Sequence, residues 1–176
     1  MTVDAERKLI YLFTDGACTG NPGPGGWGFI LRDSATGHEK EGAGGEAETT
    51  NNRMEMLAAI EGLAMLKKPS RVRLISDSQY LTRGLSEWMD KWKAKGWRRG
   101  TSPVLNLDLW KRLDALRTMH EIEVQWIRGH RGHPENERCD ELAVAEAKKF
   151  ERMNRAPRKG RPAGGSESLY DDESDA

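Results

Sequence analysis

The sequence has few of the features that mark secreted, disulfide-bonded or membrane proteins. Its two cysteines, Cys18 and Cys139, lie far apart and form neither a disulfide framework nor a Cys-x-x-Cys metal motif. No segment approaches the roughly 20 apolar residues of a membrane span. The charged N-terminus has no apolar stretch of the signal-peptide type behind it. We therefore expect a cytoplasmic protein without membrane contact.

An excess of positive charge is also missing, because 28 Lys and Arg residues balance 28 Asp and Glu residues. Net charge therefore gives no whole-chain signal for nucleic-acid binding, and only local patches could supply one. A chain of 176 residues is long enough for one domain with a sizeable core. No apolar stripe is left over after that core, so we expect a monomer.

The composition changes near Phe150, where an Arg-rich segment begins and is followed by an acidic end. This tail has almost nothing apolar to bury. We predict a catalytic or binding domain over residues 1–150 and a disordered tail over residues 151–176. The tail could modulate nucleic-acid binding or act only as a solubilising segment.

The first 150 residues alternate between strand and helix patterns. Strands are expected at residues 8–14, at 27–32, in the Gly-rich stretch through Gly45, at 71–77 and at 121–128. Helices are expected at residues 52–67, 78–95, 104–118 and from Pro134 to about Phe150. The order βββαβααβα predicts an α/β fold with a mixed five-stranded sheet and helices on both faces.

Four acidic residues occupy comparable places in this pattern. Asp15 and Asp77 end two strands, Glu55 lies in the first turn of helix 52–67, and Asp140 lies in the last helix. Ligands of α/β proteins gather outside strand ends, so these side chains could form one cluster. Clustered carboxylates repel one another, and a divalent cation such as Mg²⁺ or Mn²⁺ removes that cost. Two such ions about 4 Å apart can assist phosphodiester hydrolysis.

Each of these acids, taken alone, has a purely structural explanation. Asp15 could start a turn, and the Gly- and Pro-rich residues 14–26 after it could form a plain hairpin turn. Glu55 could close a capping box, Asp77 could cap the next helix, and Asp140 could be a solvated helix residue. The loop lacks the Gly-Lys-Ser/Thr ending of a nucleotide-binding P-loop. The combination of loop and acids favours a functional cluster.

Four motifs in order resemble bacterial ribonuclease H of type 1: T-D-G-A-C-T-G-N-P-G-P-G-G-W-G, T-T-N-N-R-M-E, S-D-S-Q-Y and G-H-R-G-H-P-E-N-E-R-C-D-E-L-A. The likeness covers roughly residues 8–148. It implies the ribonuclease H fold and a Mg²⁺-dependent endonuclease, for which Mn²⁺ can substitute. Such an enzyme hydrolyses the RNA strand of RNA–DNA hybrids and leaves 5′-phosphate and 3′-hydroxyl ends. The resemblance also implies roles for the catalytic residues: Asp15, Glu55, Asp77 and Asp140 as metal-binding acids, and His130 in proton transfer or product release.

Contacts with the hybrid are implied by the same resemblance. The family positions that contact the hybrid, mostly on the RNA side, are matched by Cys18, Asn21, Asn51, Asn52 and Gln79. Asn and Gln can both donate to and accept from a 2′-hydroxyl, whereas Cys18 is expected to use its backbone. Thr50 is expected at a DNA-phosphate pocket. Glu48 stands where some family members carry a basic residue, which puts the strength of DNA-strand binding in question.

Residues 87–99, E-W-M-D-K-W-K-A-K-G-W-R-R, are basic and carry interleaved tryptophans. Basic residues among aromatic ones suit contact with a phosphate backbone and sugars. In the resembling family this segment is a basic protrusion that grips the DNA strand. The candidate contacts are Trp88, Trp92, Lys93, Lys95, Trp97 and Arg98. The alternative is an amphipathic helix that buries Trp88 and Trp92, which are four residues apart.

Two other functions remain open from the residues alone. A ribonuclease-H-like fold could bind nucleic acid without cutting it, although all four acids are present. A zinc site could use His130, His133 and Cys139, although no second ligand pair lies nearby.

Overall fold

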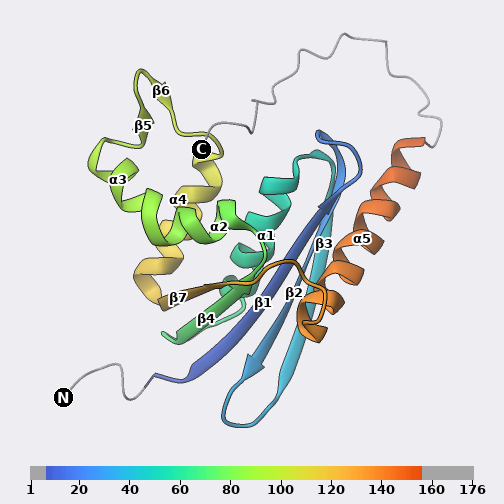
Figure 1. Cartoon of the computed structure of the whole chain (residues 1–176), viewed down its shortest axis with the longest axis horizontal. Coiled ribbons are helices and arrows are strands. Elements are labelled where there is room, and N and C mark those ends of the chain that lie inside the picture. The colour runs from blue at the N-terminus through green and yellow to red at the C-terminus, as the bar shows by residue number, and fades with distance from the viewer. Residues whose placement is uncertain (1–6, 156–176) are drawn as a thin grey trace.

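The computed structural model describes residues 7–155, which form a five-stranded sheet with helices on both faces (Figure 1). The strand order is β3-β2-β1-β4-β7. The strands are β1 (Leu9–Cys18), β2 (Gly23–Asp33), β3 (Glu39–Thr49), β4 (Arg71–Ser76) and β7 (Glu121–Trp126). The first three pair antiparallel, whereas β4 and β7 extend the sheet in parallel. The predicted fold class is confirmed.

Opposite faces of the sheet are covered by different helices. Along β2, a Cβ at Gly28 would lie 2.7 Å from the Cys139 carbonyl oxygen of α5 (Pro134–Arg155). The next residue, Phe29, packs instead beside Gly62 of α1 (Asn51–Ala64). Because successive strand residues point to opposite faces, α1 and α5 lie on opposite sides of the sheet. Helix α4 (Leu107–Met119) packs on α1.

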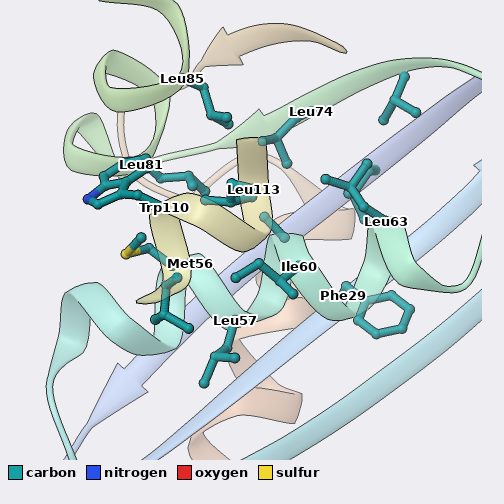
Figure 2. Close-up of a cluster of buried hydrophobic side chains, with 14 of the residues drawn as sticks. Phe29, Met56, Leu57, Ile60, Leu63, Leu74, Leu81, Leu85, Trp110 and Leu113 are labelled. Atoms are coloured by element: carbon teal, nitrogen blue, oxygen red, sulfur yellow. The ribbon is translucent and has the colours of Figure 1, made fainter. Parts of the chain in front are cut away.

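The apolar interior consists of two clusters of unequal size. The large cluster lies between the sheet and α1 and α4, where Leu63, Leu74 and Trp110 are fully buried (Figure 2). The small cluster lies on the α5 side and contains Phe13, Ile30 and Cys139. Each fully buried large apolar side chain contributes about 1.5–3 kcal/mol. The large cluster therefore holds most of the apolar stabilisation.

The first strand is longer than the sequence pattern indicates. Strand β1 continues to Cys18 and β2 already begins at Gly23, because Asp15 pairs with Gly28 and Cys18 with Gly25 across an antiparallel ladder. Asp15 therefore lies inside β1, and the expectation that it ends the strand is wrong. Much of the Gly- and Pro-rich segment is strand, and only residues 19–22 connect β1 to β2. The hairpin itself is confirmed.

The segment expected as one helix at residues 78–95 is divided into three pieces. These are α2 (Gln79–Arg83), a π-helical turn η2 (Gly84–Trp88) and α3 (Met89–Ala94). Gly84 allows close packing here, because a Cβ on it would lie 1.9 Å from the Trp110 ring. A short hairpin, β5 (Arg98–Arg99) with β6 (Ser102–Pro103), follows at left-handed Trp97 and was not anticipated from the sequence.

Helix α5 continues to Arg155, five residues beyond the boundary expected at Phe150. Glu151 pairs with Arg155 at 2.6 Å one helical turn away, and the Asn154 amide donates to the Ala47 carbonyl at 2.8 Å. The predicted tail therefore does not include residues 151–155, and its remaining part lies outside the described residues. Within residues 7–155, none of the helices has the length and apolar character that crossing a membrane requires.

Candidate active site

The four acids predicted to cluster are brought together from four different elements. Asp15 comes from β1, Glu55 from α1, Asp140 from α5, and Asp77 directly follows β4. All four line one open hollow of about 420 Å³. Its remaining lining is Gly16, Asn51, Asn52, Ser78, Gln79, Tyr80 and His130.

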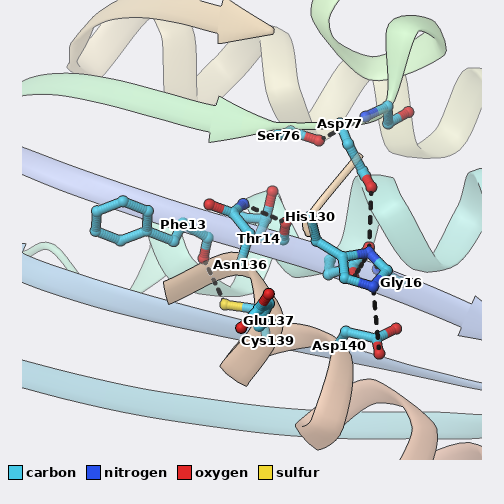
Figure 3. A network of polar contacts seen from close by, with 12 residues as sticks. Phe13, Thr14, Gly16, Ser76, Asp77, His130, Asn136, Glu137, Cys139 and Asp140 are labelled. Carbon is cyan, nitrogen blue, oxygen red and sulfur yellow. Dashed lines mark hydrogen bonds and ion pairs between the residues drawn. The ribbon is translucent and has the colours of Figure 1, made fainter. Parts of the chain in front are cut away.

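His130 lies at the centre of this arrangement (Figure 3). Its Nδ1 is 3.5 Å from an Asp77 carboxylate oxygen and 3.7 Å from an Asp15 oxygen, and its Nε2 is 3.7 Å from Asp140. The imidazole is 41% exposed, whereas the Asp15 side chain is 5% exposed. His130 therefore connects the buried part of the site to solvent.

The structural explanations for two of the acids are excluded by the caps of the helices. Thr50 caps α1, because its hydroxyl accepts a hydrogen bond from Arg53 N at 3.2 Å. Glu55 therefore lies in the second turn and not in the first, and it closes no capping box. Ser78 caps α2 by accepting from Leu81 N at 3.1 Å, so Asp77 is not the cap. Both carboxylates are left for the hollow.

Burial of the carboxylates makes their ionisation costly in the protein alone. Burial, followed by the charge of Asp77, raises the pKa of Asp15 from 3.8 to about 7. Burial also raises the pKa of Glu55 well above its ordinary value, and the charges of Asp15 and Asp77 add to this. Desolvation and like-charge repulsion therefore act in the same direction.

The donor set fits a hard divalent cation. Two groups have ligand atoms within 4.8 Å of one another: Asp15 with Glu55 and Asp77, and Asp15 with His130 and Asp140. In the described part of the chain, Asp15 Oδ2 and Glu55 Oε2 are buried and have no hydrogen-bond partner. A buried carboxylate oxygen without a donor is destabilising unless a cation completes its coordination. The cluster can therefore bind metal through oxygen ligands.

A supporting residue that sequence reasoning missed is Asn136, in the first turn of α5. It is 1% exposed, and its amide donates to the Thr14 carbonyl at 3.3 Å and to the Ile75 carbonyl at 3.0 Å (Figure 3). These carbonyls lie one residue before Asp15 and two before Asp77. Asn136 thus ties α5 to both strands that carry catalytic candidates. An Asn among the charged residues opening a helix gives no sequence signal of burial.

The predicted hybrid contacts fall into two groups. Asn51, Asn52 and Gln79 line the hollow. Asn21 supports the loop, because its side-chain oxygen accepts from Asn51 N at 3.0 Å. The Cys18 thiol lies 3.5 Å from the Gly23 carbonyl and 3.4 Å from the Thr49 carbonyl, so it faces backbone. Thr50 is 6% exposed, and Glu48 is exposed at the end of β3.

The tryptophans of residues 87–99 are partly buried, as the amphipathic alternative expects. The ring centres of Trp88 and Trp92 are 5.7 Å apart, and those of Trp92 and the buried Trp110 are 5.4 Å apart. Trp97 also packs against the large core cluster. Among the candidate cations, Lys93 pairs with Asp114 at 2.9 Å, Arg98 donates to the Thr101 carbonyl, and Lys95 is exposed. Each tryptophan therefore keeps only part of its surface for a ligand.

The zinc alternative fails on geometry. Cys139 is fully buried, and its thiol donates to the Phe13 carbonyl at 3.4 Å (Figure 3). Burial raises the pKa of this thiol, which disfavours the thiolate that zinc requires. His133 is exposed, and its backbone closes the turn by donating from its N to the His130 carbonyl at 3.0 Å. The three residues do not form one site.

Comparison with known proteins identifies the family. A profile of the RNase H family matches residues 7–148. The Ribonuclease H of Halorhodospira halophila is 57% identical over 139 residues, which cover 78% of this chain and 92% of that protein. The Ribonuclease H of Rhizobium meliloti is 53% identical over 150 residues, which cover 85% of this chain and 97% of that protein.

Solved structures agree with this assignment. The crystal structure of LC9-RNase H1, a type 1 RNase H with the type 2 active-site motif, has a TM-score of 0.74 at 31% identity and covers 82% of this chain and 74% of that one. LC11-RNase H1 in complex with an RNA/DNA hybrid shares the fold, with a TM-score of 0.58 at 24% identity over 80% of this chain and 97% of that one. The resemblance drawn from the four motifs is confirmed. The chain belongs to the ribonuclease H family, whose reaction is the hydrolysis of the RNA strand of RNA–DNA hybrids.

Proposed function

We propose that Asp15, Glu55, Asp77 and Asp140 hold two Mg²⁺ ions for the hydrolysis of the RNA strand in RNA–DNA hybrids. The observation that carries this assignment is the pair of buried carboxylate oxygens, on Asp15 and Glu55, without a hydrogen-bond donor in residues 7–155. Together with Asp77 they can place ligand atoms within 4.8 Å of one another. Four carboxylates and no cysteine suit Mg²⁺, with Mn²⁺ as a substitute.

The ions, when bound, supply charge neutralisation at the phosphate and a water that is more easily deprotonated. The chain supplies the positions of the carboxylates. Asp15 is fixed within β1, where it pairs with Gly28 of β2, and its Oδ1 accepts from Gly16 N at 2.9 Å. Asp77 is fixed by the strand before it and the capped helix after it. Reaction at the phosphate gives 5′-phosphate and 3′-hydroxyl ends.

We assign proton transfer, or help in product release, to His130. Its ring lies between Asp77 and Asp140, and its exposure allows exchange of protons with solvent. A histidine can carry a proton near neutral pH. Among residues 7–155, no cysteine lines the hollow, and its one serine, Ser78, caps α2 by accepting from Leu81 N at 3.1 Å, which is consistent with direct attack by water.

Recognition of the hybrid is assigned to two surfaces. Asn51, Asn52 and Gln79 beside the acids suit the 2′-hydroxyls of RNA, with backbone near Cys18 and Asn21 completing this side. The DNA strand is assigned to Thr50 and to the protrusion of residues 87–99, through Trp88, Trp92, Lys93, Lys95, Trp97 and Arg98. We also propose a cytoplasmic monomer whose catalytic domain lies within residues 1–155.

The test is cleavage of a labelled RNA–DNA hybrid of about 20 base pairs, with and without Mg²⁺. Double-stranded RNA, double-stranded DNA and the Asp15→Asn protein serve as controls. We expect Mg²⁺-dependent cutting of the RNA strand of the hybrid only, with loss of activity in Asp15→Asn. Hybrid binding without cutting, in either Mg²⁺ or Mn²⁺, would contradict the assignment and leave a binding module.

A further inference from the structure

The loop between β7 and α5, residues 127–133, carries His130 and two arginines to which no role has been assigned. Arg128 and Arg131 are both exposed. No hydrogen bond or ion pair joins either of them to another part of residues 7–155, whereas eight other arginines there, among them Arg32, Arg53 and Arg117, form ion pairs. Two guanidinium groups are thus left without an anion on the segment next to the reaction centre.

This loop is held at both ends, so its arginines have a defined location. At its start, the Trp126 indole donates to the Asp77 carbonyl at 3.1 Å, and Ile127 N donates to the Ser76 carbonyl at 3.0 Å. At its end, Gly132 N donates to a Glu137 carboxylate oxygen at 3.0 Å. The anchors at the start lie on, or directly before, a catalytic candidate. The start of the loop that carries Arg128 and Arg131 is therefore fixed to the backbone of Ser76 and Asp77.

The hollow itself has no cationic side chain apart from His130, because its lining contains neither lysine nor arginine. A nucleic-acid strand that enters it carries a phosphate at every nucleotide, and only the phosphate at the reaction centre faces the bound ions. The neighbouring phosphates need other cations. Arginine suits this task because its guanidinium binds phosphate oxygens in a bidentate manner.

The position of the loop indicates which strand it would contact. The loop runs from the end of β7 across the sheet to α5, whereas the protrusion of α3, β5 and β6 lies away from it, beyond α2 (Figure 1). The strand that is cut must pass the acids and hence the loop. Trp126, at the start of this loop, is 44% exposed and is the only aromatic residue among the exposed large hydrophobic side chains of residues 7–155. It offers an apolar surface for a sugar next to the two cations.

We propose that Arg128 and Arg131 bind the backbone phosphates of the RNA strand that flank the cleaved phosphate. This rests on the proposed function of the acids, and it adds a cationic contact on the side of the centre opposite the protrusion. The two arginines contribute to binding and to the placement of the strand, without touching the reacting atoms.

The experiment measures hybrid affinity in EDTA, where no cleavage occurs, at 50 and 200 mM salt. The variant Arg128→Ala/Arg131→Ala is compared with Lys40→Ala/Lys68→Ala, which removes the same charge from two exposed lysines at the opposite end of the sheet. The salt slope is the steepness with which the logarithm of the association constant falls as the logarithm of the salt concentration rises. Each lost phosphate contact lowers this slope by about 0.7–0.9. We expect the slope of the arginine variant to fall by about 1.5, so that the advantage of the wild type shrinks about eightfold between the two salt concentrations. The lysine variant should keep the wild-type slope.

Strand choice is tested with hybrids that carry neutral methylphosphonate linkages flanking the cleavage position. Linkages in the RNA strand should remove the difference between wild type and the arginine variant, and linkages in the DNA strand should preserve it. Equal slopes for both variants, or a difference removed only by DNA-strand linkages, would overturn the inference. Cleavage of the hybrid by the wild type in Mg²⁺ is scored separately, so failure of the arginine contact is distinguishable from failure of the catalytic assignment.

Discussion

Replacing Asp15 with Asn should stabilise the protein when divalent cations are absent. The Asp15 carboxylate is buried and faces the charges of Asp77 and Asp140, which raises its pKa from 3.8 to about 7. The amide of Asn carries no charge. Its oxygen can keep the hydrogen bond from Gly16 N, and its new donor faces Glu55. The substitution therefore removes an electrostatic cost and adds a partner for a buried oxygen.

The size of the effect follows from the linkage between protonation and folding. A raised pKa in the folded state means that the protein binds this proton more tightly than the unfolded chain does. Its contribution to stability is complete below pH 3.8 and is lost as the pH rises to about 7. Because the pKa of Asp15 is about 3 higher in the folded protein, wild type loses about 4 kcal/mol of its free energy of unfolding between strongly acidic solution and pH 8. At pH 5 this loss is about 2 kcal/mol.

Urea unfolding followed by circular dichroism, in EDTA at pH 5 and pH 8, measures this difference. Asp15→Asn should exceed wild type in the free energy of unfolding, and by more at pH 8. Asp33→Asn is the control, because the ion pair with Lys8 lowers the pKa of Asp33, so this substitution should destabilise the protein at both pH values. Equal stability of wild type and Asp15→Asn at pH 8 would refute the account of buried repulsion. Millimolar Mg²⁺ should then stabilise wild type more than Asp15→Asn.

Three further substitutions test other parts of the structure. Gly84→Ala should lower the free energy of unfolding by about 1–3 kcal/mol, because its Cβ would meet the Trp110 ring, although Ala normally favours helix; an unchanged melting temperature would contradict this. Asn136→Ala should lower kcat about 10-fold or more with little change in KM, because the carbonyls of Thr14 and Ile75, close in sequence to Asp15 and Asp77, lose their donor. Asn154→Ala should leave kcat unaltered. Burial lowers the pKa of His120, so the folded protein favours the neutral ring. Wild type should therefore lose stability as the pH falls below 6.5. His120→Asn should show a flatter decline in melting temperature between pH 8 and pH 5.

The fold class and the clustering of the four acids could be predicted from sequence because their signals are local. Alternating and continuous apolar runs indicate strands, and four separate motifs place the acids in order. The boundaries could not be read in the same way. Strand β1 runs past Asp15 because β2 pairs with it, and the glycines of β2 look like loop residues until that pairing is known. The same holds for α5, whose last turn depends partly on the contact of Asn154 with β3.

The support of the site escaped prediction for a related reason. Asn136 has the polar character of its neighbours, and only the packing of α5 against β1 and β4 makes it a buried donor. The tryptophans of the protrusion were ambiguous in sequence, because helical spacing suits both a core and a surface. The structure shows that Trp92 packs against Trp110, which lies in a different helix, and that the tryptophans keep part of their surface exposed.

The unequal division of the core has a consequence for how the enzyme fails under stress. Asp140 and Asn136 belong to α5, whose side of the sheet holds only the small cluster of Phe13, Ile30 and Cys139, while the large cluster lies on the opposite face. Undocking of α5 would therefore separate Asp140 from the other three acids and leave most of the folded interior in place. Activity should thus be lost at a lower temperature than secondary structure, and amide protons of α5 should exchange with solvent before those of α1. The time for which the enzyme stays active is then determined by how firmly α5 packs on the sheet.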